Sequence, residues 1–93
     1  PVLVLDEPTT GLDVLASSAM IDFIESARAS GTCILFSTHV LSEAERLCDR
    51  IGVLHAGRLL ASGTLDELCA LTGKVWLEDV FRELVRRAVE DGR

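Results

Sequence analysis

Two adjacent carboxylates, Asp6 and Glu7, stand directly after an unbroken apolar run over residues 2–5. A continuous apolar run of this length predicts a strand buried on both faces, as in a parallel sheet. Polar residues at the carboxyl end of such a strand lie where open α/β sheets bind their ligands. Because two neighbouring acids are unfavourable there without a cation, the pair predicts a bound, hydrated Mg²⁺.

A histidine, His39, follows the second predicted strand, residues 32–36, after Ser37 and Thr38. A helix from Asp13, its N-cap, to about residue 30 joins the two strands. Right-handed crossovers of this kind build parallel sheets. A lone histidine is more often a structural residue, but this one stands at a strand end and opens a helix predicted over residues 40–49. An imidazole at that position can reach a bound phosphate.

These two motifs resemble the Walker B segment, the D-loop and the switch-histidine loop of the ABC-transporter ATPases. The first motif is the apolar strand with its carboxylate pair, continued by Pro8, Thr9, Thr10, Gly11, Leu12 and Asp13. The second is Ser37, Thr38 and His39, followed by Glu43, Ala44 and Glu45. Residues 77–81 also resemble a segment near the end of ABC-2-type exporter ATPases. The resemblance covers nearly the whole chain, but only the later part of the family's domain.

The resemblance implies hydrolysis of ATP with Mg²⁺ as cofactor, a reaction that depends on charge neutralisation and a positioned water. Asp6 is expected to hold Mg²⁺, directly or through its water shell. Glu7 is expected to polarise the attacking water as a general base. His39 is expected to contact the γ-phosphate, which makes it both a catalytic and a nucleotide-binding residue.

The D-loop resemblance also implies partners. Gly11, Leu12 and Asp13 are expected to contact a second ATPase domain in a head-to-tail dimer. The other expected partner is an integral membrane permease, which would place the protein in the cytoplasm, on the cytoplasmic face of the membrane. No apolar run of the chain approaches the roughly 18–20 residues of a membrane span. The net charge of -6 argues against a general nucleic-acid binder, so no nucleic acid is expected.

Three interpretations stay open from the sequence alone. The chain is part of the ATP-hydrolysing subunit of an ABC transporter, part of a soluble ABC-type ATPase, or a non-catalytic truncated relic. The predicted hairpin and residues 77–81 favour the transporter. The phosphate loop G-x-x-x-x-G-K-[ST] (Walker A) and the family's signature motif are absent from the chain. We therefore expect the full-length parent to be an ATP hydrolase and the isolated chain to bind ATP weakly or not at all.

The predicted fold class is α/β, a partial parallel P-loop NTPase sheet of the RecA-like, ABC ATPase kind with flanking helices. Residues 51–55 and 58–61, around Ala56 and Gly57, predict a short β-hairpin. Thr64 and Glu67 predict a capping box for a helix that ends near residue 71. The last helix is predicted over residues 77–90. We expect residues 1–62 to be the remainder of the catalytic core and residues 63–93 a C-terminal helical segment of the same domain.

Several side chains are predicted from helical spacing alone. One apolar face of the first helix is expected from Ala16, Ala19, Met20, Phe23, Ile24 and Ala27. Glu43 and Glu45 are expected on the solvated face of the second helix, and Trp76 is expected as a packing anchor. The three cysteines are expected to be reduced thiols.

Overall fold

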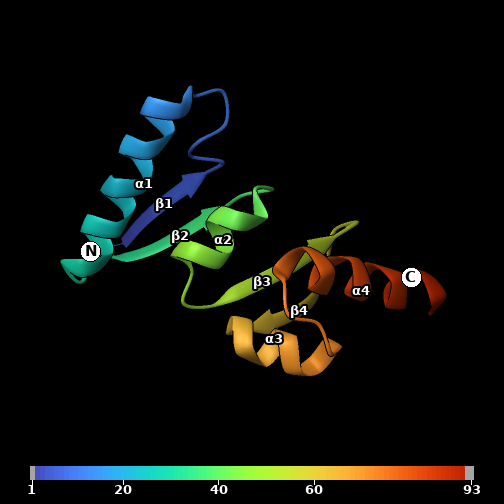
Figure 1. Ribbon diagram of the computed structural model, residues 1–93. Coiled ribbons are helices and arrows are strands. Elements are labelled where there is room, and N and C mark those ends of the chain that lie inside the picture. Colours follow the sequence, from blue (N-terminus) through green and yellow to red (C-terminus); the bar gives the residue numbers. More distant parts are fainter. Residues whose placement is uncertain (1, 92–93) are drawn as a thin grey trace. The chain divides into compact units, whose positions relative to one another are not determined.

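The computed structural model describes residues 2–91, which carry eight helices and strands (Figure 1). Their order is β1 (Val2–Asp6), α1 (Val14–Ala29), β2 (Cys33–Ser37), α2 (Leu41–Leu47), β3 (Ile51–His55), β4 (Arg58–Gly63), α3 (Leu65–Thr72) and α4 (Leu77–Glu90). The α/β fold class, the hairpin and the C-terminal helices are confirmed. The chain divides into two compact units, Pro1–Glu43 and Ala44–Arg93.

In the first unit, β1 and β2 pair in parallel and α1 forms the crossover between them. The register runs from Val2 opposite Cys33 to Asp6 opposite Ser37, so the two strands end at the same level. Helix α1 packs against β2. This pairing places the residues that follow β1 next to those that follow β2, as the sequence predicts.

The ends of α1 are built as the sequence predicts. Asp13 Oδ1 accepts a hydrogen bond from Ala16 N at 2.8 Å and so caps the helix. Gly31, with φ of 89°, ends it in the left-handed conformation that suits glycine. The predicted apolar face is wrong in part, because Ile24 is buried whereas Phe23 is 52% exposed. The buried face of this helix is therefore narrower than its sequence spacing predicts.

The strand pair β1–β2 has an open face, which corrects the prediction of a strand buried on both faces. The side chains of Val2, Val4 and Leu35 are 72%, 68% and 66% exposed. Among residues 2–91 this sheet has two strands. Successive side chains point to opposite faces of a sheet, and here they alternate between exposed and half-buried. An apolar run is compatible with burial on both faces but does not show that both faces are buried.

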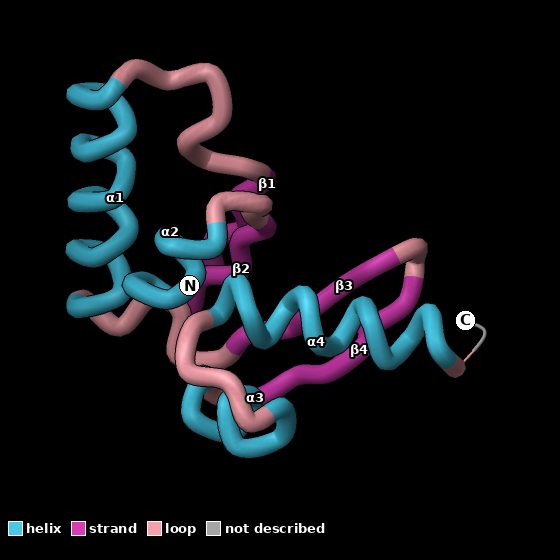
Figure 2. The backbone as a smooth tube through the Cα atoms, turned by 45° about the vertical axis from the view of Figure 1, so that its right-hand side comes forward, coloured by secondary structure: helices cyan, strands magenta, loops and turns pink. Residues whose placement is uncertain are grey.

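The second unit is built on the antiparallel hairpin β3–β4, beside which α4 runs (Figures 1 and 2). Ala56 and Gly57 at its tip have φ of 51° and 77°, the left-handed pair that a two-residue hairpin turn requires. Helices α3 and α4 pack on β4 and on each other. The core of this unit includes the buried side chains of Val53, Leu68, Leu77, Val80 and Leu84.

The helices of the second unit begin in different ways. Thr64 and Glu67 form the predicted capping box at α3. Within residues 2–91, the N-cap of α4, Trp76, makes no side-chain cap bond; instead Glu45 Oε1 accepts from Leu77 N at 2.6 Å. Glu45 is half-buried, so its assignment to the solvated face is wrong. Trp76 is 64% exposed and is no packing anchor, because Leu77 takes the buried position beside it.

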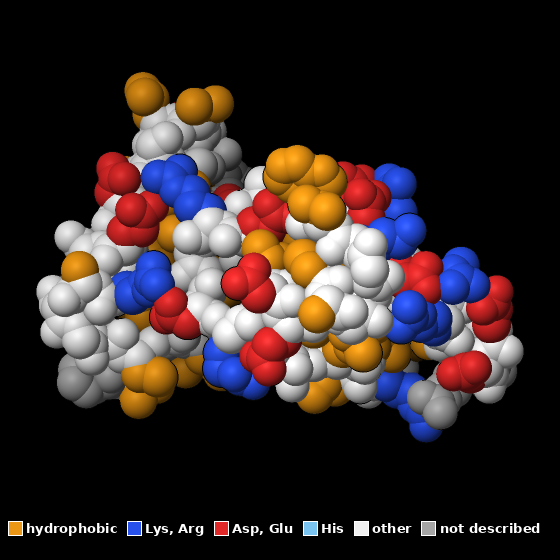
Figure 3. All heavy atoms as spheres, turned by 60° about the horizontal axis from the view of Figure 1, so that its bottom comes forward, with side chains coloured by type: hydrophobic (Ala, Val, Ile, Leu, Met, Phe, Trp, Pro, Cys, Tyr) orange, Lys and Arg blue, Asp and Glu red, His pale blue; other side chains and the backbone are white. Residues whose placement is uncertain are grey.

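The outer face of α4 is charged. Arg82 pairs with Glu78 at 2.7 Å, and Arg86 pairs with Glu83 and Glu90 at 2.6 Å each. Figure 3 shows acidic and basic side chains side by side on the right of the view, the side on which Figure 1 places α4. The exposed pairs Arg82–Glu78 and Arg86–Glu90 contribute little to stability individually, so the buried leucines and Val80 hold this helix in place.

Candidate functional site

The first site residue, Asp6, is the last residue of β1 and lies opposite Ser37, the last residue of β2. Ser37 Oγ donates a hydrogen bond to Asp6 Oδ1 at 2.6 Å. Asp6 is exposed, so its carboxylate is open to a ligand. Mg²⁺ keeps several waters and is held in proteins by one or two carboxylates together with substrate phosphates. A single exposed aspartate therefore fits Mg²⁺ that arrives with a nucleotide.

Glu7 has a strained backbone, with φ of 51° although it is not glycine. Its amide donates to Ser37 O at 2.9 Å, and its carbonyl accepts from Thr10 N at 3.1 Å. Thr10 Oγ1 also donates to Glu7 Oε2 at 2.9 Å. A left-handed conformation of this kind is unfavourable by roughly 1–3 kcal/mol and persists where the surroundings over-determine it. The turn thus holds the Glu7 carboxylate in a fixed direction.

His39 lies against Glu7, with 2.5 Å between His39 Nδ1 and Glu7 Oε2. The structure therefore brings together the two residues for which the sequence predicts catalytic roles. The side chains are 73% and 33% exposed, so a ligand can reach both of them. This pair and Asp6 all lie at or just after the level ends of β1 and β2.

The bond between Glu7 and His39 restricts where the protons can be. If the carboxylate is ionised, Nδ1 carries the hydrogen, and Nε2 can donate to an anion only when the imidazole is doubly protonated. If Glu7 carries the hydrogen, a neutral imidazole accepts it at Nδ1 and donates from Nε2. Nε2 therefore carries a hydrogen for an anionic ligand only when one proton lies between Glu7 and His39 and a second is bound at Nε2.

The predicted D-loop residues lie in the turn between Glu7 and α1. Gly11 has φ of 81°, a left-handed value that favours glycine. Leu12 is 42% exposed, and Asp13 is the helix cap described above. Among the described residues, no side-chain hydrogen bond joins these three to Asp6 or His39. The structure thus places them on the surface and next to the site in sequence, and the backbone of Leu12 joins that of Thr9, with N to O at 3.2 Å.

One residue of the network was missed by the sequence reasoning. Both carboxylate oxygens of Glu43 accept from Thr9 Oγ1, at 2.9 and 2.7 Å, and Oε1 also accepts from Thr38 Oγ1 at 3.4 Å. Glu43 is half-buried, so its placement on the solvated face is wrong. One partner was near in sequence, because Thr38 stands five residues before Glu43.

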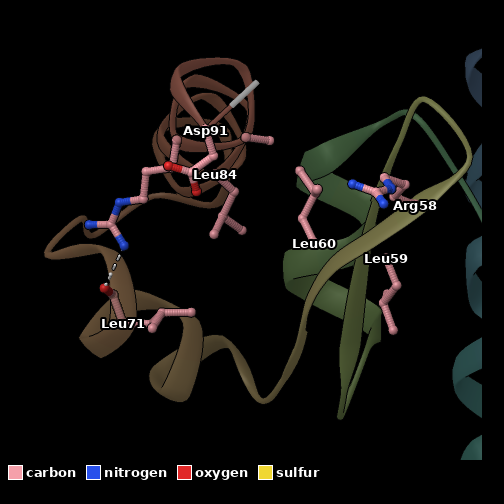
Figure 4. Close-up of a pocket in the computed structure, with 8 residues that line it drawn as sticks. Arg58, Leu59, Leu60, Leu71, Leu84 and Asp91 are labelled. Atoms are coloured by element: carbon pink, nitrogen blue, oxygen red, sulfur yellow. Dashed lines mark hydrogen bonds between the residues drawn. The ribbon is translucent and has the colours of Figure 1, made fainter. Parts of the chain in front are cut away.

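The second unit contains an open cavity of about 700 Å³, lined by apolar side chains together with two arginines and one aspartate (Figure 4). Its lining comes from β4, α3, α4 and Asp91: Arg58, Leu59, Leu60, Leu71, Leu84, Arg87, Ala88 and Asp91. Arg87 is held in place, because it donates to Leu71 O at 3.2 Å and to Glu83 at 2.7 Å. The predicted site residues belong to the first unit.

Similar proteins were found among curated sequences and among solved structures, whereas no protein-family model matches the chain. The daunorubicin resistance ATP-binding protein DrrA3 of Streptomyces coeruleorubidus is 49% identical over 82 residues, which are 88% of this chain and 26% of that protein. The ABC-type transporter ATP-binding protein EcsA of Bacillus subtilis is 41% identical over 85 residues, 89% of this chain and 34% of EcsA.

A third relative, the Nod factor export ATP-binding protein I of Rhizobium leguminosarum, is 53% identical over 62 residues, 67% of this chain and 20% of that protein. A solved structure of an ATP binding subunit of an ABC transporter superposes with a TM-score of 0.84 at 41% identity. The match covers 91% of this chain and 36% of that structure. The chain therefore spans about a third or less of the length of these proteins.

Proposed function

The chain belongs to the family of ABC-transporter ATP-binding proteins, and we propose that it is the C-terminal part of a subunit that couples ATP hydrolysis to transport through a membrane permease. The observation that carries this proposal is the contact between Glu7 and His39, 2.5 Å apart beside Asp6. All three residues lie at or just after the level ends of two parallel strands, where α/β sheets bind ligands.

In the proposed reaction these side chains arrange the attack of water, and Mg²⁺, when bound, would supply charge neutralisation at the phosphates of ATP. Asp6 would hold the ion, partly through water, with a carboxylate oxygen that Ser37 orients. Glu7 takes the proton of the attacking water, and His39 contacts the γ-phosphate through the ring nitrogen that Glu7 does not occupy. A general base of this kind contributes roughly 10²–10⁴ in rate.

The proposed partners are a second ATPase domain and an integral membrane permease. Gly11, Leu12 and Asp13 would contact the second domain in a head-to-tail dimer, which the surface position of this turn supports. The relatives named for export and for drug resistance support a transport role over a soluble ABC-type ATPase. In the described part of the chain, no helix is long and apolar enough to cross a membrane. Because the proposed partner is a permease, we propose that the protein lies in the cytoplasm, peripheral to the membrane.

The proposed domain organisation assigns residues 1–62 to the catalytic core and residues 63–93 to a C-terminal helical segment. Motifs for holding the nucleotide phosphates would come from the preceding part of the domain. For that reason we expect the isolated chain to be inactive, and the proposed activity is a property of the full-length subunit.

The test is ATP hydrolysis by the full-length subunit, with and without Glu7→Gln. The expected result is a fall in kcat of about two to four decades with ATP binding retained. Asp22→Asn, which removes an exposed carboxylate of α1, is the matched control and should leave kcat unchanged. Equal activity of Glu7→Gln and wild type would refute the assignment of the base. No turnover by the wild type, even with its permease, would favour the relic.

A further inference from the structure

Glu43 links the two turns that carry the predicted catalytic residues. Its carboxylate accepts the one hydroxyl hydrogen of Thr9, whose Oγ1 lies 2.9 Å from Oε1 and 2.7 Å from Oε2, and a longer bond from Thr38 Oγ1, at 3.4 Å. Thr9 stands two residues after Glu7, and Thr38 stands one residue before His39. A single half-buried side chain of α2 thus connects residues that lie 29 positions apart in the sequence.

The turn after β1 needs such a link because its conformation is not one that its sequence prefers. Glu7 has φ of 51° and precedes Pro8, whereas a residue before proline favours an extended backbone. Bonds within the turn, such as that from Leu12 N to Thr9 O at 3.2 Å, fix its shape, and the bond from Glu7 N to Ser37 O at 2.9 Å joins its start to β2. The Thr9–Glu43 contact supplies a side-chain tie between this turn and α2.

Thr38 connects Glu43 to the turn that carries His39. Its hydroxyl accepts from Val40 N at 2.9 Å, at the start of α2, and can donate to Glu43 at the same time. A hydroxyl has one donor and two acceptor sites, so the two roles are compatible. Moving Glu43 would therefore disturb the turn that carries His39 as well as the turn that carries Glu7.

We propose that Glu43 is a positioning residue for ATP hydrolysis, which through Thr9 and Thr38 keeps the Glu7 carboxylate against the His39 imidazole. This inference rests on the proposed function. Glu43 acts on the reaction through its two threonine partners and does not itself touch a reacting atom. A displacement of about 1 Å at a catalytic group can lower a rate by roughly 10²-fold, so the link should appear in kcat.

The experiment measures kcat, KM for ATP and the melting temperature of the full-length subunit carrying Thr9→Val, Glu43→Ala or both. We expect kcat to fall about ten- to a hundredfold in each single variant, with KM within about threefold of wild type. The double variant should be no slower than the slower single variant, because both changes break one contact. Thr9→Ser keeps the hydroxyl and should restore kcat to within about threefold.

The controls separate this inference from the proposed function. Ser42→Ala alters an exposed neighbour on α2 and should leave kcat and the melting temperature unchanged. Wild-type kcat in both single variants, or fully additive losses in the double variant, would overturn the positioning role. If Glu43→Ala does not fold, the comparison of Thr9→Val with Thr9→Ser decides, and equal kcat in those two variants refutes the role. Failure of the proposed function itself would appear separately, as unchanged turnover in Glu7→Gln.

Discussion

The N-terminus of α4 is capped from another helix, and removing this cap should destabilise the second unit. Glu45 Oε1 accepts from Leu77 N at 2.6 Å. Leu77 is 1% exposed, so water cannot readily replace the carboxylate when it is removed. In Glu45→Ala the amide loses a hydrogen bond to a charged acceptor, and roughly 1.5–3 kcal/mol of stability is typical for such a bond.

Urea unfolding of the chain measures this loss. Trp76, its single tryptophan, adjoins the capped residue and reports on it by fluorescence, while circular dichroism reports on the helices. For a domain of this size, about 2 kcal/mol corresponds to a fall in melting temperature of roughly 8–16 °C. Glu45→Gln keeps an oxygen acceptor and should lose less. Ser42→Ala, an exposed change on the same helix, should stay within about 0.5 kcal/mol.

Two results would refute this reasoning about the α4 cap. If Glu45→Ala unfolds at the same urea concentration as the wild type and the Leu77 amide exchanges hydrogen no faster, the bond contributes nothing to stability. If Glu45→Gln loses as much as Glu45→Ala, the stabilisation comes from negative charge near the helix N-terminus and not from the hydrogen bond.

Three further outcomes are expected. Ala56→Asn, at a turn position with φ of 51°, should raise the unfolding free energy by about 0.5–1 kcal/mol in urea, because asparagine tolerates this conformation. Hydrogen bonds from Arg86 and Arg87 lower the pKa of Glu83 from 4.5 to about 2; because the folded pKa is depressed, its contribution is complete above pH 4.5 and is lost as the pH falls towards 2. Unfolding measured over that pH range should show this loss in the wild type and not in Glu83→Gln. Leu68→Ala, at a side chain 1% exposed, should lower the unfolding free energy by about 2–5 kcal/mol.

Much of the fold could be predicted from the sequence because its signals are local. The pair Ala56 and Gly57 marks the hairpin, and Thr64 with Glu67 marks the start of α3, each through contacts within four residues. The proximity of Glu7 and His39 was also accessible, because a parallel register brings the ends of adjacent strands together. These features depend on short-range chemistry and on one rule of chain connection.

What could not be predicted depends on distant neighbours. Glu43 and Glu45 flank one alanine and look alike in sequence, yet their partners Thr9 and Leu77 lie 34 and 32 residues away. The exposure of Val4 depends on which elements cover the sheet, and the sequence of the strand does not state that. The left-handed backbone of Glu7 is unusual for a glutamate, so the sequence gives no reason to predict it.

The conformation of Glu7 sets two evolutionary pressures against each other at a single residue. Glycine or asparagine would adopt a φ of 51° with less strain than glutamate does. Selection for folding alone, as in a display library sorted for protease resistance, therefore has a reason to replace Glu7. Selection for turnover has the opposite reason, because the replacement deletes the carboxylate. The amino acid recovered at position 7 from each kind of library would thus show whether that library had been selected for folding or for turnover.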